Sequence, residues 1–520
     1  MNQYRWFRAG DVNAFFALMF DNVANLVILA SILIGAFHMP KDIVLYRMVP
    51  GTAIGVLLGD LIYAWMAWQL AKKSDRDDVT AMPLGLNAPS IFGMSFAVIG
   101  PVYVLSGDAM QAWKTGMAVT VLAGIFKIAL SFAGNRVRLI VPRAALLGSI
   151  GGAGLALIGV LPLLKVFADP IPGFVAISLL LVTLVGRNRL PWKIPGALGS
   201  AMAGIATFYV LRWLHISSPL LATRTSISLA LHLSFPWPTL SFLGGLSTAW
   251  KYLPIALPFA LSTVVGGIDN TESAAAAGDE YDTRAILLTE GVCTLAAGLC
   301  GGVVESTPYI GHPAYKAMGA GAGYTVLTGL FIGIGSVFGF LPFFVDWIPA
   351  SAVAPILVYI GLEVIAQAFL ATPQRHGLAV SISLLPSLAF LAYLEANSVL
   401  TTLGSSINQI AGDTGESLRT LALLGNGFII SAILWGAATA TLIDRKFRAS
   451  ALYLVTGALF SLFGIIHSPA VGGSFVLPWK ANASISWHFA AAYLLGAGVV
   501  ATAKFLSPQD EVAKVTVKVS

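Results

Sequence analysis

Charge is what this sequence has least of. Asp, Glu, Lys and Arg together make up 10% of its 520 residues, against about 25% in an ordinary soluble protein. Hydrophobic residues supply 57%, and the mean hydropathy is +0.83. No polar stretch between the apolar segments is long enough for a separate soluble domain. The composition therefore excludes a soluble globular protein and predicts an all-α polytopic membrane protein.

Cysteine and enzyme motifs are also scarce. The two cysteines, Cys293 and Cys300, lie in apolar sequence and are interpreted as small buried hydrophobic residues, not as a disulfide or a metal site. No H-E-x-x-H, G-x-S-x-G or phosphate-loop motif is present. The first residues lack a short apolar region followed by a cleavage site, so we expect the first helix to be retained. We expect no enzyme activity, no cofactor and no metal.

Apolar segments long enough to cross a bilayer divide the chain into seven spans, a connector, seven more spans and two extra ones. Spans 1 to 7 are expected near residues 12–37, 43–71, 80–104, 114–134, 138–163, 170–186 and 194–214. Spans 8 to 14 are expected near 252–277, 284–302, 303–319, 321–343, 347–371, 376–396 and 419–443, and the extra pair near 450–467 and 486–505. The division is thus a first repeat (1–214), a connector (215–250), a second repeat (251–443) and a C-terminal part (444–520) with a cytoplasmic tail.

Lysine and arginine residues in the predicted inner loops account for the net charge of +6. With the N-terminus inside, most Lys and Arg residues fall in inner loops, and Lys127 falls within a span. This bias predicts a multi-pass protein of the cell (inner) membrane with both termini in the cytoplasm. It also explains the basic balance without a nucleic-acid partner.

The two sets of seven spans are related. Asp21-Asn22 in span 1 matches Asp269-Asn270 in span 8, and spans 3 and 10 are both short and interrupted by Pro and Gly. An odd number of spans per repeat inverts the second half. Broken backbone at mid-membrane is tolerated only where it lines a cavity, so paired interrupted spans indicate a binding site at the bilayer midplane.

Polar side chains gather in these spans, where each ionised group costs ~2.5–3.5 kcal/mol at the bilayer centre. The substrate-binding candidates are Asp269, Asn270, Glu272, Thr307, Tyr309, Asn87, Ser90, Phe92 and Asn22. The ion-coupling candidates are His312, Glu305 and Asp21.

Alternatives stay open for several of these residues. Glu272 can be interfacial, and His312 can be a satisfied core histidine. Asp21 and Asn22, with the neighbouring Asn25, can form a structural polar seam. Asp60 and Glu290 are interpreted as helix-packing or interfacial groups.

The motifs resemble the nucleobase–ascorbate transporter superfamily, the xanthine/uracil permeases, and its adenine/guanine/hypoxanthine permease branch most. The resemblance covers about residues 10–440 and rests on Gly85-Leu-Asn87-Ala88, Asp269-Asn-Thr271, Thr307-Pro-Tyr309 and Gly323-Tyr-Thr325. It implies a seven-plus-seven inverted repeat, in which spans 1–4 and 8–11 form a core domain and spans 5–7 and 12–14 a gate domain. It also implies a base bound between half-helices 3 and 10, proton coupling and a homodimer.

Two departures accompany this resemblance. Gly311 stands where the family usually has an acidic residue, and the two extra C-terminal spans are atypical. We expect a secondary active transporter that imports a purine-like nucleobase by proton symport with alternating access, with sodium as the other candidate ion. An anion exchanger of the same fold and a non-transporting membrane sensor or scaffold with a substrate pocket are the alternatives.

Overall fold

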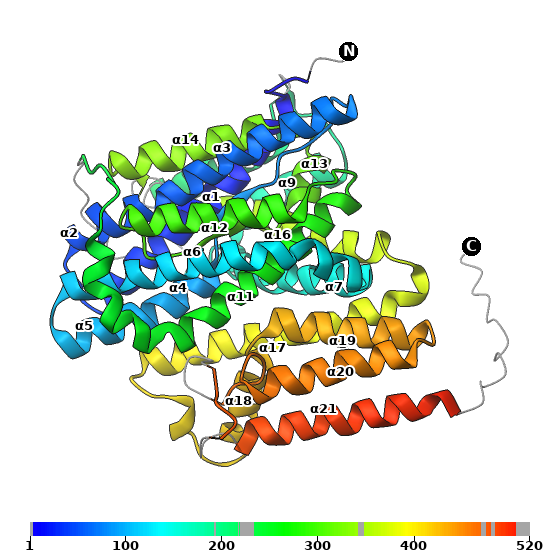
Figure 1. The fold of residues 1–520 in the computed structure, drawn as a ribbon. Helices are drawn as coiled ribbons and strands as arrows, with labels where there is room; N and C mark the ends of the chain where they lie inside the picture. The colour runs from blue at the N-terminus through cyan, green and yellow to red at the C-terminus, as the bar shows by residue number, and fades with distance from the viewer. Residues whose placement is uncertain are drawn as a thin grey trace.

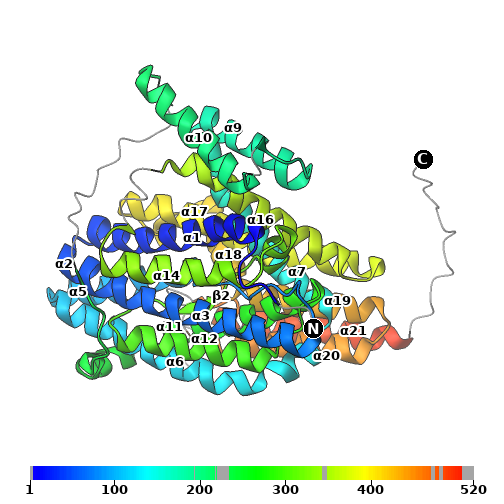
Figure 2. The ribbon, with the colours of Figure 1, turned by 90° about the horizontal axis from the view of Figure 1, so that it is seen from above.

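The protein is described by a computed structural model that covers residues 4–191, 194–216, 218, 233–341, 348–469, 475–479 and 484–505. Long helices lie side by side (Figure 1). Within the described residues a single pair of short strands joins them near the middle of the bundle, where Figure 2 labels β2. The first half consists of α1 (Ala9–Ser31) with η1 (Ile32–Ala36), α2 (Lys41–Ile43), η2 (Val44–Met48), α3 (Val49–Ser74), β1 (Leu84–Leu86), α4 (Ala88–Met94), η3 (Ser95–Ile99), α5 (Gly100–Ser106), α6 (Ala109–Ile140), α7 (Arg143–Ala153), η4 (Gly154–Val160), α8 (Leu161–Ala168), α9 (Pro170–Leu180), η5 (Leu181–Val185) and α10 (Gly196–Trp213).

The second half repeats this order. It consists of η7 (Ser241–Gly245), α11 (Leu246–Ala276), α12 (Thr283–Leu299), β2 (Ser306–Pro308), α13 (His312–Ala317), α14 (Gly323–Val337), α16 (Ala350–Leu370), η8 (Gln374–His376), α17 (Gly377–Thr402), η9 (Ile407–Gln409), α18 (Gly412–Gly425) and α19 (Phe428–Ile443). The C-terminal addition is α20 (Phe447–Leu462), α21 (Ser484–Thr502) and η12 (Ala503–Phe505).

The two strands show how the halves are related. β1 and β2 pair antiparallel, with Gly85 opposite Thr307 at the centre of the register. Helix α6 packs against α12 of the other half, and α3 packs against α14 in the same way. This exchange of partners is the packing that a two-fold axis between inverted repeats produces. The predicted all-α, seven-plus-seven inverted-repeat fold with discontinuous spans 3 and 10 is confirmed.

Seven helices of the described chain are long and apolar enough to cross a bilayer, or eight if α18 and α19 count as one span. The sequence predicted span 14 as one helix over 419–443, but α18 and α19 meet at an angle of 76°. Gly427 lies at this corner with a φ of +66° and closely approaches the backbone of Ile465. Because a side chain would strain this conformation and meet that backbone, glycine permits the bend.

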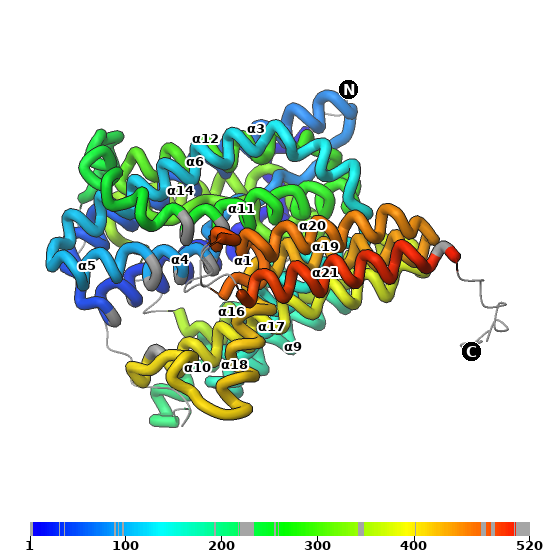
Figure 3. The backbone as a smooth tube through the Cα atoms, turned by 60° about the horizontal axis from the view of Figure 1, so that its bottom comes forward, coloured from blue at the N-terminus to red at the C-terminus, as the bar shows by residue number. Residues whose placement is uncertain are grey.

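The remaining helices lie around the crossing of the strands. Helix α16 packs against α7, α9 and α10, and in Figure 2 α9 and α10 stand apart from the rest of the bundle. Helices α19, α20 and α21 lie side by side with α21 at the edge of the bundle (Figure 1), and all three come to the front in Figure 3. The start of α1 and the end of α21 lie at the same end of the bundle (Figures 1 and 2).

Candidate functional site

The site is built around the paired strands β1 and β2, where the two broken spans meet. We call this pairing the strand crossing. Tyr309 N donates to Pro83 O at 2.8 Å just beyond the paired strands. Asn87 Oδ1 accepts from Ser90 N at 2.9 Å and so caps the start of α4. Thr307 lies at the centre of the pairing, opposite Gly85. The extended backbone that interrupts the two spans thus brings four predicted substrate residues together at the paired strands: Asn87, Ser90, Thr307 and Tyr309.

Asparagines from α1 and α11 hold the two strands from outside. Asn22 Oδ1 accepts from Leu86 N at 3.2 Å, and Asn22 Nδ2 donates to Leu18 O at 3.1 Å. In the other half, Asn270 Nδ2 donates to Pro308 O at 2.9 Å. Asn22 and Asn270, which the sequence matched, therefore play equivalent roles, because the side-chain amide of each is hydrogen-bonded to the backbone. We consequently place Asn22 and Asn270 in the support of the crossing, as the structural-seam alternative for Asn22 anticipated.

A second matched pair acts from α3 and α12. Asp60 Oδ1 accepts from Leu84 N at 3.1 Å, and Thr294 Oγ1 accepts from Ser306 N at 3.2 Å. Asp60 is fully buried. It is therefore a packing group that satisfies a strand amide, and its interfacial alternative does not fit.

Lys127 on α6 forms the centre of a buried ionic cluster. Its Nζ lies 2.7 Å from Glu305 Oε2 and 2.9 Å from Glu290 Oε1, and it donates to Ser306 O at 3.0 Å. The side chains of Lys127 and Glu290 are 0% exposed. One ammonium therefore faces two carboxylates in the interior, and the fully ionised cluster has a net charge of −1.

Glu305 connects this cluster to both broken spans. Ser90 Oγ at the start of α4 donates to Glu305 Oε1 at 2.5 Å, and Thr263 Oγ1 on α11 lies 3.3 Å from Glu305 Oε2. Charge-assisted hydrogen bonds of this kind are the strong ones. Glu305 therefore holds α4, α6 and α11 together directly beside β2.

Asp269 on α11 is different, because its carboxylate is buried without a donor. Its side chain is 0% exposed, and neither oxygen has a hydrogen-bond partner in the described part of the chain. Ser149 on α7 is close to it but donates to Ile429 O at 3.2 Å instead. The next residue, Asn270, bonds to β2. Asp269 thus offers two free acceptor oxygens between α11 and α7, next to the strand crossing.

Asp21 and Tyr309 form a smaller group on the α1 side. Asn25 Nδ2 donates to Asp21 Oδ2 at 2.9 Å. The hydroxyl group of Tyr309 is buried close to Asp21 without hydrogen-bonding geometry. Phe92 lies on α4, but its side chain is outside the described residues.

Glu272 lies away from the crossing, toward the end of α11. Its Oε2 accepts from Arg138 Nε at 2.7 Å, and its Oε1 pairs with Arg143 at the start of α7. The sequence predicted that Glu272 binds substrate together with Asp269. Instead, the turn between α6 and α7 brings two arginines to Glu272, so its carboxylate is engaged in joining helices, as its interfacial alternative allowed.

His312 also lies toward this end of the bundle. Its Nε2 is 3.1 Å from Thr80 O and 3.3 Å from Asp279 Oδ2. Asp279 also pairs with Lys316 Nζ at 2.7 Å and with Arg76 at 3.2 Å. Burial alone raises the pKa of Asp279, but hydrogen bonds and charges from His312 and Lys316 hold this pKa below its usual value. Two of the three sequence candidates for ion coupling, His312 and Glu305, therefore belong to separate clusters.

Sequence reasoning overlooked Lys127, Thr263 and Ser149 as site residues. Lys127 carried a signal, because a lysine within an apolar span is costly unless an acidic partner meets it. Thr263 and Ser149 carried none, since single hydroxyl residues are common in membrane helices.

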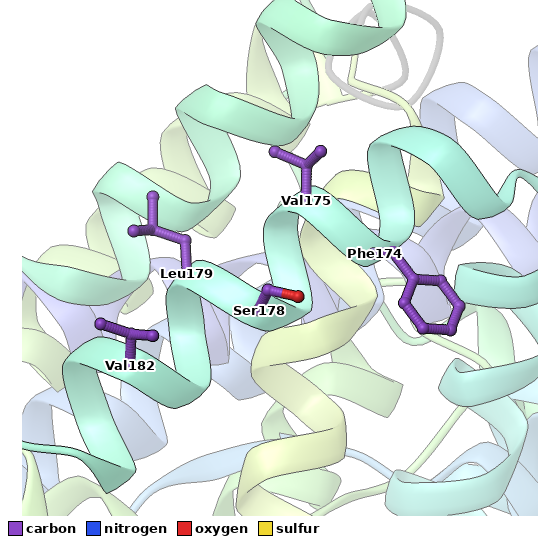
Figure 4. A pocket seen from close by; sticks show the side chains of 5 residues that line it. All are labelled: Phe174, Val175, Ser178, Leu179 and Val182. Atoms are coloured by element: carbon purple, nitrogen blue, oxygen red, sulfur yellow. The ribbon is translucent and has the colours of Figure 1, made fainter.

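An open hollow of about 540 Å³ on α9 does not coincide with these polar residues. It is lined by Phe174, Val175, Ser178, Leu179 and Val182. Figure 4 shows that all five side chains come from this one helical segment. Because its lining is almost wholly apolar, the hollow offers no chemistry for a polar ligand.

None of the protein-family models and none of the curated sequences compared with the chain matches it. Two similar solved structures are the transmembrane domain of a cyanobacterium bicarbonate transporter BicA and the structure of SLC26A9. The first has 14% identity and a TM-score of 0.42, covering 84% of this chain and 98% of that chain. The second has 12% identity and a TM-score of 0.40, and the match covers 74% of this chain and 63% of that chain. At these identities and TM-scores, nothing about this chain's substrate follows from either likeness.

Proposed function

We propose that this protein is a secondary active transporter that imports a nucleobase by proton symport. The observation that carries the proposal is Asp269, a fully buried carboxylate with two free acceptor oxygens beside the crossing of two broken spans. A buried carboxylate in this state lacks the donors that normally stabilise it. A ligand with N–H groups would supply them.

A nucleobase suits this acceptor because its ring N–H groups can donate to a carboxylate while its carbonyl oxygens accept from backbone amides. The motifs that resemble the adenine/guanine/hypoxanthine permease branch support the same substrate class. Asp269 and Tyr309 are the residues we place against the base. Asn87, Ser90 and Thr307 position the backbone behind it.

Membrane placement is part of the proposal. Both termini are placed in the cytoplasm of an inner-membrane homodimer. The common end of α1 and α21 in the bundle supports placing both termini on one side. The basic residues of the two clusters at that end, among them Arg76, Arg138 and Lys316, support assigning it to the inside.

An anion transporter is the second candidate, and the buried ammonium of Lys127 favours it. However, Glu290 and Glu305 already engage this ammonium. An anion would have to displace one of these carboxylates from the ammonium, and breaking a buried ion pair raises the cost of binding. For this reason the nucleobase comes first.

Uptake in proteoliposomes tests the choice. Purines, pyrimidines and ascorbate are compared with bicarbonate, sulfate and chloride under imposed proton and sodium gradients. Accumulation of a base under a proton gradient supports the proposal. Anion flux without base flux would establish the second candidate, and base-induced thermal stabilisation without any flux would indicate a sensor.

A further inference from the structure

The geometry points to Glu290 on α12 as the residue that carries the coupling proton, in an ion cluster whose fixed cation is Lys127. This inference rests on the proposed proton symport and deepens it, because neither the sequence motifs nor the interrupted spans select Glu290. It replaces His312, Glu305 and Asp21 as the proton carrier.

The two carboxylates of the cluster differ in how they are satisfied. Glu305 receives Ser90 Oγ at 2.5 Å and Lys127 Nζ at 2.7 Å, one at each of its oxygens. Both bonds favour its ionised form, since an ionised carboxylate is acceptor-only. Both oxygens of Glu305 are therefore already engaged.

Glu290 is less fully satisfied than Glu305. Its Oε1 lies 2.9 Å from Lys127 Nζ, and the hydroxyl of Thr263 is close but donates to Ala260 O at 2.9 Å. Among the described residues, neither oxygen accepts a hydrogen bond of good geometry. Its Oε2 faces Gly267 on α11, where an added Cβ would approach within 2.9 Å. The cluster has one positive and two negative groups, and Glu290 Oε2 is the open position where a proton makes it neutral. An uncompensated buried charge is costly, so neutrality favours the bound proton.

The other groups around Glu290 do not offer a competing charge. On α3, Tyr63 lies near Glu290, and its hydroxyl donates to Ile286 O at 3.0 Å. Cys293 is a buried thiol on α12 itself. Asp60 is a second acidic neighbour of Cys293, and its Oδ1 accepts from the amide of Leu84. Lys127 and Glu305 are thus the charges that Glu290 senses directly.

The proton is linked to the broken spans through the shared lysine. When Glu290 is protonated, Lys127 is left to pair with Glu305, which holds Ser90 at the start of α4. When the proton leaves, the new carboxylate at Glu290 competes for the same ammonium and weakens its bond to Glu305. Each proton bound or released therefore changes how firmly α4 is held beside the substrate.

The variant Glu290→Gln mimics the protonated state and tests the inference in proteoliposomes. With one proton per base, a gradient of one pH unit drives about tenfold accumulation by the native protein. In Glu290→Gln we expect the base still to bind and to exchange across the membrane, with an affinity that does not depend on pH. The proton gradient should no longer drive accumulation, so the base concentrations inside and outside should become equal. Glu363→Gln is the matched control, because Glu363 lies on the spanning helix α16 and pairs with Tyr359 Oη at 2.9 Å. It should accumulate base like the native protein.

Infrared spectroscopy of the protein without any base separates this inference from the proposed function. The carboxylic-acid C=O band of the native protein at neutral pH should lose one component in Glu290→Gln and none in Glu305→Gln or Glu363→Gln. This measurement needs no transport, and the native protein's spectrum serves even if the proposed substrate is wrong. A native protein without a protonated carboxyl group, an unchanged band in Glu290→Gln, or full proton-driven accumulation by this variant would overturn the inference.

Discussion

The ammonium of Lys127 and the carboxylate of Glu305 form an ion pair with a separation of 2.7 Å, in which Lys127 is 0% and Glu305 6% exposed. The pair joins the middle of α6 to the segment that leads into β2. Both residues also make hydrogen bonds to their surroundings, to Ser306 O and from Ser90 Oγ respectively. The crossing of the broken spans is thereby fixed to a long unbroken helix.

Removing the cation from this cluster should be costly. Lys127→Met leaves Glu290 and Glu305 buried without their common partner, and breaking a buried ion pair in this way costs about 3–5 kcal/mol. We expect a correspondingly lower free energy of unfolding in detergent, measured by denaturant titration. Lys73→Met, at an exposed position, is the control and should leave stability unchanged. The double variant Lys127→Met/Glu290→Gln should recover part of the loss, and equal stability of Lys127→Met and the native protein would refute the cluster.

The asparagines should prove structural. Asn22→Ala removes bonds to Leu86 N and Leu18 O, and Asn270→Ala removes the bond to Pro308 O. Leaving buried backbone groups unpaired costs about 1–3 kcal/mol per site. Thermal unfolding should therefore shift down in both variants, while the folded fraction binds base with near-native affinity. A large loss of affinity with unchanged stability would return these residues to the list of substrate ligands.

Asp269 should behave in the opposite way. If its free oxygens accept from ring N–H groups, Asp269→Asn should abolish base binding and leave insertion and folding intact. Each charge-assisted hydrogen bond that is lost removes about 1.5–3 kcal/mol, and a ligand donor left unpaired in the buried site adds to this loss. Calorimetric titration of the purified variant measures this loss, with Ser149→Ala as the control for the neighbouring hydroxyl. Native affinity in Asp269→Asn would remove this residue from the site.

Acid should weaken the cluster around Asp279. The pKa of this carboxyl is held below its usual value of about 3.9. A group with a depressed folded pKa contributes stability that is fully present above the unfolded pKa and is lost as pH falls through the folded pKa. We therefore expect thermal stability to fall below about pH 4.

The variant Asp279→Asn identifies the source of this acid effect. It should already lack the stabilisation at neutral pH and should show a weaker dependence on acid. Asp77→Asn, in the exposed loop nearby, is the control. An acid profile that is identical in Asp279→Asn and the native protein would contradict the assignment.

The sequence by itself determined the helical membrane fold, because backbone groups in a bilayer must be paired within helices and each helix needs a long apolar run. It also determined that the halves are inverted repeats. The match of Asp21-Asn22 with Asp269-Asn270 has a structural counterpart, since Asn22 and Asn270 both support a strand. The helical fold and the repeat both depend on the spacing of residues along the chain, which can be read from the sequence directly.

The tertiary structure alone decided which polar groups meet. Lys127, Glu290 and Glu305 come from three separate elements, and the packing of α6 against α12 brings them together. Glu305 and His312 are close in sequence, but β2 and the turn after it separate them into different clusters. A one-dimensional pattern gives the face of a helix on which a side chain lies. It does not give the neighbour that covers this face, because that neighbour is chosen by close packing of the whole bundle.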